Sequence, residues 1–243
     1  MKPFALLAGC LAVLVPTPSH AAAASVPETV VLLHGLGRTS WSMSALAREL
    51  EQAGFRVVNP SYPWRSRTLE QLAADWLPAQ LVKLPPTPRV HLVTHSMGGL
   101  LVRAWLREHG APPNLGRVVM LAPPNAGSEI PDAFGAAAPF RWLTGPSGPR
   151  LGTAPDALPA TLGPWPAPAI DLGIIAGSGA SSATLGAAVP APHDGKVSVA
   201  STHLDGARDH LVLPFSHTWI AWQRETAAQV AHFLRTGRFA AQP

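Results

Sequence analysis

The most informative stretch of the sequence places a serine between an apolar run and a pair of glycines. Residues 89–99 read Arg-Val-His-Leu-Val-Thr-His-Ser-Met-Gly-Gly, so Ser96 ends a predicted strand and precedes a predicted helix. A sharp strand-to-helix turn exposes a serine hydroxyl where a base and a substrate can both reach it. The pattern predicts a nucleophile at Ser96, although Thr94 stands where the G-x-S-x-G pattern has glycine. A plain helix cap at Ser96 is the alternative interpretation.

A serine hydroxyl is a weak nucleophile until a base accepts its proton. Among the ten histidines, His217 fits this role best because it follows a short apolar run broken by Pro214 and precedes the last predicted helix. His203 is the runner-up on position alone. His210 lies inside the apolar run, where a packed or hydrogen-bonded histidine is expected. We expect His95, the neighbour of the serine, to point away from its hydroxyl.

The predicted acid partner is Asp194, which lies after the apolar run 172–176 and 23 residues before His217. A carboxylate in this place would hold the imidazole in one tautomer and stabilise the imidazolium that forms during proton transfer. Asp205 and Asp209 are rivals for the role. Because Asp-Gly is also a common turn dipeptide, a purely structural aspartate remains an alternative.

A second motif precedes the serine by about sixty residues. The apolar run 29–33 ends in His34-Gly35-Leu36-Gly37, which places a tight turn at the end of a predicted strand. We expect His34 to be a positioning residue and not the base. A strand end with no chemical role is the alternative.

Alternating apolar runs and amphipathic stretches predict a parallel sheet covered by helices. The expected strands are 29–33, 56–58, 90–93, 118–121, 172–176 and 210–213. The expected helices are 43–53, 68–82, 97–109 and 224–235, with glycines after the first, third and fourth. Thr68 and Gln71 form a predicted capping box in the second helix, which Pro78 should kink or end.

These motifs, taken in their order, resemble the α/β-hydrolase superfamily. Within it they are similar to the bacterial secreted esterases and lipases of the class 2 lipase type, which carry His-Gly before the first helix and His-Ser-Met-Gly-Gly at the serine turn. The resemblance covers residues 29–239. It implies the α/β-hydrolase fold, a mostly parallel central sheet with helices on both faces, and an oxyanion hole formed by the backbone N–H groups of Leu36 and Met97.

The segment 123–168 is rich in proline, glycine and alanine and shows no clear period, so we expect loops that form a lid or substrate loop. Asn125, Gly127 and Ser128 follow a predicted strand and could line the pocket, with a plain loop as the alternative. For Trp142 and Trp165, local packing is the alternative to acyl-chain contact. The candidates for the substrate pocket are His34, Gly35, His95, Asn125, Trp142 and Trp165.

Composition favours one compact domain over residues 25–243, because 47% of the 243 residues are hydrophobic and 13% are charged. The net charge of +4 comes from scattered residues, so we expect no nucleic-acid partner. No metal or cofactor is expected, since Asp205 and Asp209 are too few to make a calcium site. We expect a monomer that binds a small-molecule or lipid ester and transiently contacts a lipid surface.

The N-terminal residues 1–24 are predicted to be a signal peptide, with Lys2, an apolar run and small residues near Ala21. The protein is therefore expected to be exported, to the periplasm or beyond. A lipoprotein anchored through Cys10 is the alternative. Cys10 is the only cysteine, so the mature chain would contain no internal disulfide.

The predicted activity is hydrolysis of a carboxylic ester through an acyl-enzyme, as in an esterase or lipase. Acyltransferase, thioesterase or amidase activity would use the same three side chains. A catalytically silent exported binding protein is the alternative from another class.

Overall fold

A computed structural model describes residues 26–180 and 186–242. The predicted signal segment 1–24, with Cys10, lies outside the described residues. In the part of the chain that is described, no helix is both long enough and apolar enough to span a bilayer.

The core of the fold is a six-stranded sheet in which every neighbouring pair of strands is parallel. Its spatial order is β2-β1-β3-β4-β5-β6. The strands are β1 (Thr29–Leu33), β2 (Arg56–Val58), β3 (Val90–His95), β4 (Leu115–Leu121), β5 (Leu172–Gly177) and β6 (Asp209–Leu213). All six predicted strands are present, four of them longer than predicted, and the predicted parallel central sheet is confirmed.

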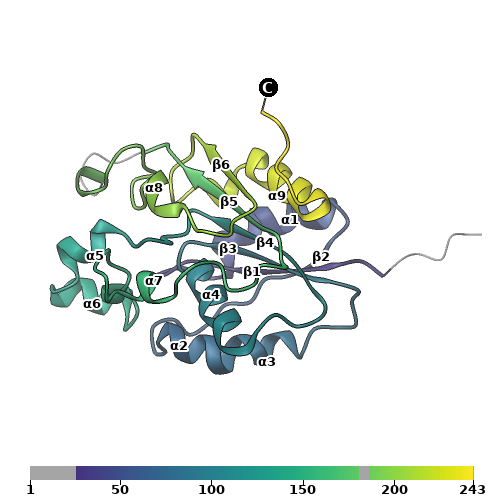
Figure 1. Ribbon diagram of the computed structural model, residues 1–243, viewed down its shortest axis with the longest axis horizontal. Coiled ribbons are helices and arrows are strands. Elements are labelled where there is room, and N and C mark those ends of the chain that lie inside the picture. The colour runs from purple at the N-terminus through teal and green to yellow at the C-terminus, as the bar shows by residue number, and fades with distance from the viewer. Residues whose placement is uncertain (1–25, 181–185, 243) are drawn as a thin grey trace, which may run out of the picture.

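Helices cover both faces of this sheet (Figure 1). The helices are α1 (Ser44–Gln52), α2 (Leu69–Gln71), α3 (Leu77–Leu81), α4 (Met97–His109), α5 (Glu129–Phe134), α6 (Ala138–Thr144), α7 (Leu158–Thr161), α8 (Val199–Thr202) and α9 (Arg224–Thr236). Short 3-10 turns occupy Ser40–Met43, Gly148–Arg150, Gly186–Ala188 and Ile220–Trp222. In Figure 1, α1 and α9 lie on one side of the sheet and α2, α3 and α4 on the other.

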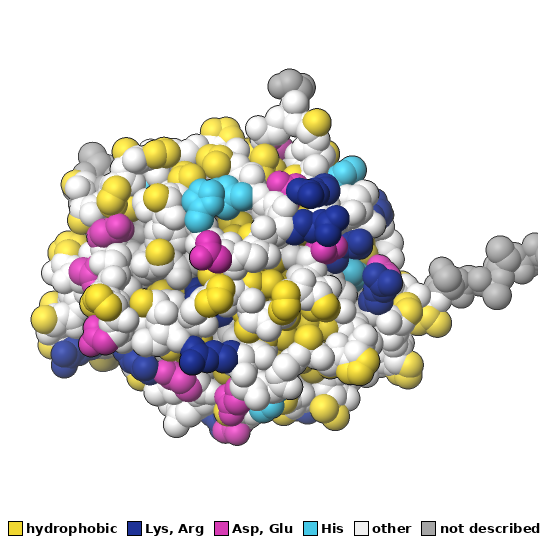
Figure 2. All heavy atoms as spheres, in the orientation of Figure 1, with side chains coloured by type: hydrophobic (Ala, Val, Ile, Leu, Met, Phe, Trp, Pro, Cys, Tyr) yellow, Lys and Arg dark blue, Asp and Glu magenta, His cyan; other side chains and the backbone are white. Residues whose placement is uncertain are grey.

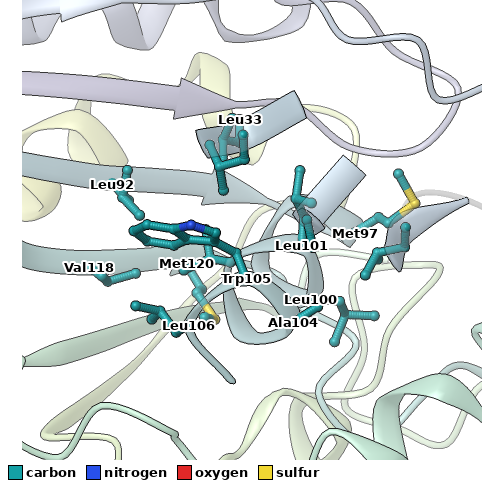
Figure 3. Close-up of a cluster of buried hydrophobic side chains, with 14 of the residues drawn as sticks. Leu33, Leu92, Met97, Leu100, Leu101, Ala104, Trp105, Leu106, Val118 and Met120 are labelled. Carbon is teal, nitrogen blue, oxygen red and sulfur yellow. The ribbon is translucent and has the colours of Figure 1, made fainter. Parts of the chain in front are cut away.

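Two hydrophobic clusters result, one on each face. Successive residues of a strand point to opposite faces, so Val30 and Leu32 enter the cluster beneath α1 and α9, whereas Val31 and Leu33 enter the cluster beneath α4. Figure 3 shows the second cluster, with Trp105 of α4 beside the strand residues. Since both faces are buried, the strands read as continuous apolar runs and not as alternating ones.

The helical region after Thr68 begins as predicted, with a capping box between Thr68 and Gln71. It does not end at Pro78. A π-helical turn over Leu72–Trp76 precedes α3, and the Leu77 N–H donates to the carbonyl of Leu72, five residues back. Because proline lacks an N–H and its ring collides with the carbonyl four residues earlier, the wider turn lets the chain stay helical around Pro78.

The segment 123–168 is more ordered than its composition predicts. It forms α5, α6 and α7 at one end of the molecule (Figure 1), which corrects the expectation of loops without secondary structure. Ser128 caps α5, while Pro139 and Pro159 occupy the first turns of α6 and α7. Proline is well tolerated there because the first N–H groups of a helix need no intrahelical partner. These helices have at most seven residues, too few to show a period in the sequence.

Candidate active site

Ser96 lies at the junction of β3 and α4 in an unusual backbone conformation. Its φ of 53° and ψ of −125° fall outside the regions that L-residues favour. A conformation of this kind costs on the order of 1–3 kcal/mol and persists only where the surroundings enforce it. The turn sets the Ser96 side chain at the end of the sheet, in the wall of a cavity.

Gly98 is required for this turn because α4 passes close to β1. A Cβ atom at Gly98 would lie 2.6 Å from the Leu33 carbonyl oxygen and 3.0 Å from that of His34. Thr94, where the motif has glycine, is fully buried and pairs in register with Leu33 and Met120. The Thr94 hydroxyl has no hydrogen-bond partner among the described residues, so the threonine is accommodated at some energetic cost.

His217 and Asp194 reach Ser96 from two separate loops. The Ser96 Oγ lies 3.1 Å from His217 Nε2, within hydrogen-bond distance. On the other side of the ring, His217 Nδ1 lies 2.7 Å from Asp194 Oδ2. A carboxylate accepts only, so Nδ1 carries the proton and Nε2 is free to accept the serine proton. The three side chains form one hydrogen-bonded series.

Asp194 is held rigidly within this series. Its Oδ1 accepts from the N–H groups of Lys196 at 2.9 Å and Val197 at 2.8 Å, and its carbonyl accepts from the His217 N–H at 2.9 Å. The Asp194 residue is 1% exposed. The acid and the base are thus fixed to each other through the backbone as well as through their side chains.

The rival histidines and aspartates lie elsewhere. The His203 and His210 rings stack on each other at 3.9 Å, and His210 Nε2 lies 2.8 Å from the Thr202 hydroxyl. Asp209 accepts from the N–H groups of its neighbour His210 and of Phe239, while Asp205 is exposed. The structure brings none of these four side chains to Ser96.

The turn after β1 is fixed by an aromatic pair. The rings of His34 and Tyr62 stack at 4.0 Å, and the Tyr62 hydroxyl donates to the His34 carbonyl at 2.5 Å. A Cβ at Gly35 would lie 3.0 Å from both the His95 Nδ1 and the Ser96 Cβ. His34 and Gly35 therefore bring the turn close to the serine, and burial lowers the pKa of His34.

His95 supports the base and does not contact the serine hydroxyl. Its Nε2–H donates to the His217 carbonyl at 2.9 Å, and the two rings lie 4.8 Å apart. Burial holds the pKa of His95 well below its usual value, and the charges of His217, Lys196 and Arg38 add to this effect. A neutral His95 carries its proton on Nε2, because a carbonyl can only accept.

Ser96 and His217 line a cavity of about 610 Å³. Most of its wall is apolar and comes from the segment after β4, namely Ile130, Pro131, Phe134, Pro139, Phe140, Leu143 and Leu151. We call these residues the apolar wall. Leu36 and Ser128 also line the cavity, and Phe134 and Leu143 are 43% and 57% exposed, so the wall continues to the surface.

None of the six predicted pocket residues lines this cavity. His34, Gly35 and His95 position the turn and the base, and the other three lie elsewhere. Asn125 is buried and structural: its side chain donates to the Thr202 carbonyl at 2.8 Å and accepts from Arg103 at 3.2 Å. Trp165 belongs to the core beneath α4, with its indole N–H bonded to the Ile170 carbonyl. Trp142 is 74% exposed and lines a separate cavity, where it faces Arg65. Of the two tryptophans, Trp165 fits the packing alternative, whereas the exposed Trp142 does not.

Two cations in the cavity wall were not predicted. Arg38 follows the His-Gly turn, and Lys196 follows Asp194 by two residues. They come from positions 158 residues apart, so only the folded chain brings them to one cavity. Burial lowers the pKa of Lys196, and the nearby charge of Arg38 lowers it further.

Nothing in the described ranges 26–180 and 186–242 groups three or more metal-ligating side chains. On the face drawn in Figure 2, charged side chains of both signs lie interspersed with neutral and hydrophobic surface.

The chain belongs to the alpha/beta hydrolase family, which matches residues 30–241. Similar solved structures include a lipase of Bacillus licheniformis in its mature form, at 18% identity and a TM-score of 0.63, covering 93% of this chain and 95% of the lipase. A phospholipase of Legionella pneumophila is similar at 17% identity and a TM-score of 0.66, over 87% of this chain and 60% of the phospholipase.

A metagenomic carboxyl esterase is similar at 19% identity with a TM-score of 0.63, over 84% of this chain and 70% of the esterase. No curated protein matches the sequence. At these identities the structural likeness establishes the fold, and the activity has to be argued from the site itself.

Proposed function

We propose that the protein is a serine hydrolase that cleaves carboxylic esters through an acyl-enzyme. One observation carries the proposal: Ser96, His217 and Asp194 form a continuous hydrogen-bonded series at the wall of an apolar cavity. The similarity to proteins named lipase, phospholipase and carboxyl esterase supports the same class of reaction.

In the first step, Ser96 Oγ attacks the ester carbonyl while His217 Nε2 takes the serine proton. The tetrahedral intermediate collapses, the bond to the alcohol oxygen breaks, and the imidazolium returns the proton to the leaving alcohol. Water then attacks the acyl-serine with His217 again as base, which releases the acid and restores Ser96. Asp194 stabilises the imidazolium in both halves of the reaction.

The negative charge on the carbonyl oxygen requires donors. We propose the backbone N–H groups of Leu36 and Met97 for this role. Met97 is the first residue of α4, so its N–H has no acceptor within the helix, and Leu36 lines the cavity beside Ser96. Loss of one such donor typically costs about 3–4 kcal/mol of transition-state stabilisation.

We propose that the apolar wall binds the acyl chain of the substrate, because its side chains are hydrophobic. The exposed side chains of Phe134 and Leu143 at its outer end would contact a lipid surface transiently. We also propose that the protein is exported, since the sequence carries a signal-like segment at residues 1–24. We propose that it acts as a monomer. The segment 123–168 would then act as a substrate lid.

The test is hydrolysis of p-nitrophenyl esters from acetate to palmitate by the purified protein and by Ser96→Ala. We expect the wild type to hydrolyse at least part of the series and Ser96→Ala to lose more than about 1,000-fold in kcat. Equal rates for the two proteins would refute the proposal. The same series, measured with an amide and a thioester of the preferred acyl chain, separates esterase from amidase and thioesterase activity.

A further inference from the structure

Arg38 and Lys196, which we call the cation pair, are the charged residues other than His217 that line the cavity of Ser96. No aspartate or glutamate lines it. Among the residues that the structure describes, neither member of the cation pair has a carboxylate within 4.0 Å of its charged nitrogens. The charge of Asp194 acts on Lys196 from a distance, but its two carboxylate oxygens bond to backbone N–H groups and to His217 and form no ion pair with either cation.

Hydrogen bonds hold the loops that bear Arg38 and Lys196 in place. The Arg38 carbonyl accepts from the Trp64 indole N–H at 2.9 Å, and its guanidinium donates to the Thr218 hydroxyl at 3.2 Å. The Lys196 N–H donates to Asp194, and the Lys196 carbonyl accepts from the Ser128 hydroxyl at 2.8 Å. The cation pair is therefore presented by two rigid loops, as a ligand site requires.

Two like charges held together in a partly buried wall are unfavourable without an anion. Burial and the charge of Arg38 lower the pKa of Lys196, and the charge of Asp194 offsets this only in part. An anionic ligand between them would relieve the repulsion. A guanidinium offers a planar fork that suits carboxylate and phosphate, and an ammonium supplies a compact charge.

The position of the pair indicates which part of the substrate carries the anion. His217 must return its proton to the leaving alcohol, so the alcohol has to lie next to His217 Nε2. Arg38 is hydrogen-bonded to Thr218, the residue that follows His217, and Lys196 lies two residues after Asp194. The apolar wall comes from a different segment, α5, α6 and Leu151, and is left for the acyl chain.

We propose that the preferred substrates are acyl esters whose alcohol carries an anionic group, a phosphate or a carboxylate, bound by Arg38 and Lys196. This inference rests on the proposed ester hydrolysis and specifies its substrate class. The acyl chain lies against the apolar wall, and the anion remains on the alcohol that leaves first.

The experiment compares matched soluble esters below their micelle concentrations. One pair is 1-hexanoyl-glycerol 3-phosphate against 1-hexanoyl-glycerol, and the other is O-hexanoyl glycolate against its methyl ester. The readout is the ratio of kcat/KM for the anionic ester to that for the neutral ester. We expect a ratio well above one for at least one pair, and the pair that shows it identifies phosphate or carboxylate as the anion.

The variants Lys196→Gln and Arg38→Gln should each lower this ratio by about 10- to 100-fold, the usual range for one hydrogen bond to a charged group. Lys196→Arg should keep most of it, and Lys196→Glu should bring it below one. Lys83→Gln and Arg48→Gln are the matched controls, because both side chains are exposed and neither lines the cavity. The controls should leave the ratio as in the wild type.

A wild-type ratio near one in both pairs would overturn the inference, as would equal ratios in the wild type, Lys196→Gln and Arg38→Gln. Hydrolysis of the neutral esters by the same preparations keeps the proposed function separate, since that activity would survive failure of the inference. If Lys196→Gln does not fold, Lys196→Arg and Arg38→Gln carry the comparison. High salt should lower the wild-type ratio, because screening weakens interactions between partly exposed charges.

Discussion

Helix α4, which begins directly after Ser96, and the helices α5 and α6, which line the cavity of Ser96, are built differently. Ten consecutive residues of α4, from Met97 to Leu106, are buried, whereas α5 and α6 contain no buried residue. The nucleophile therefore rests on close-packed core, and the apolar wall rests on helices that pack lightly. Chemistry is placed on the rigid part of the molecule, and substrate contact on the part that can change most easily.

A buried cation of α4 holds residues on both sides of the segment that carries α5 and α6. Arg103 of α4 is 1% exposed and donates to the carbonyls of Asn125, Pro159 and Gly163. Burial lowers its pKa to about 10, so it remains charged at neutral pH. Arg103 differs from Lys196 and Arg38 in that carbonyls of the protein occupy its guanidinium, whereas the cation pair faces the cavity.

The largest effect should come from the rigid part. Asp194→Asn would replace an acceptor by an amide and favour the wrong tautomer of His217, so we expect kcat/KM for p-nitrophenyl butyrate to fall by about 10⁴-fold. Asp205→Asn, which alters an exposed rival, is the control and should fall less than about twofold. A loss below tenfold in Asp194→Asn would mean that the hydrogen bond at 2.7 Å does not orient the base.

The next largest effect should come from the link between the two parts. Arg103→Met would leave buried carbonyls without a donor, and we expect the free energy of unfolding in urea to fall by about 3 kcal/mol. Arg48→Met, at an exposed position of α1, should change it by less than ~0.5 kcal/mol. Limited proteolysis should then cut first within residues 129–163. A loss similar to that of Arg48→Met would show that the segment does not depend on Arg103.

The apolar wall should control chain length with a smaller effect. Phe140→Ser should lower the ratio of kcat/KM for octanoate over acetate by about tenfold, since burial of an aromatic side chain stabilises by about 1.5–3 kcal/mol. Trp142→Ser, on the same helix but facing the other cavity, is the matched control and should alter the ratio little. If the tryptophan variant has the larger effect, the acyl chain binds on the opposite side of α6.

The smallest predicted effect is the pH dependence of stability, which should come from histidines outside residues 123–168. The histidines whose pKa is lowered by burial, His34, His91, His95 and His210, all lie outside residues 123–168. A folded-state pKa below the unfolded value of 6.5 means that the unfolded chain binds the proton more readily. Stability is then full above pH 6.5 and is lost as the pH falls toward the folded pKa.

For His210 the folded pKa is about 4. Between pH 6.5 and 4.5, the free energy of unfolding should fall by about 1 kcal/mol less in His210→Gln than in the wild type. This value is reduced for solvent screening, because the His210 ring is partly exposed. Urea unfolding at pH 7.5, 6.0 and 4.5 measures this. Parallel stability curves for the wild type and His210→Gln would contradict the prediction.

The same contrast explains which features of the fold and of the site could be predicted from the sequence. Strands buried on both faces leave apolar runs, and the Ser96 and His34 motifs encode backbone turns, so both could be recognised locally. Asn125 looked like a pocket residue because it follows β4 at the correct edge, but Arg103, 22 positions away, determines its orientation. The cation pair depends on a contact between residues far apart in the chain, for which no local pattern exists.

The central claim is that the Ser96 hydroxyl is activated by His217 within the folded protein. Treatment with a fluorophosphonate probe, followed by mass spectrometry of peptides, tests it most directly. We predict one phosphonylated residue, Ser96, in the wild type, and labelling slowed by at least about 100-fold in His217→Ala. An unlabelled Ser96, or equal labelling of the wild type and His217→Ala, would contradict the account.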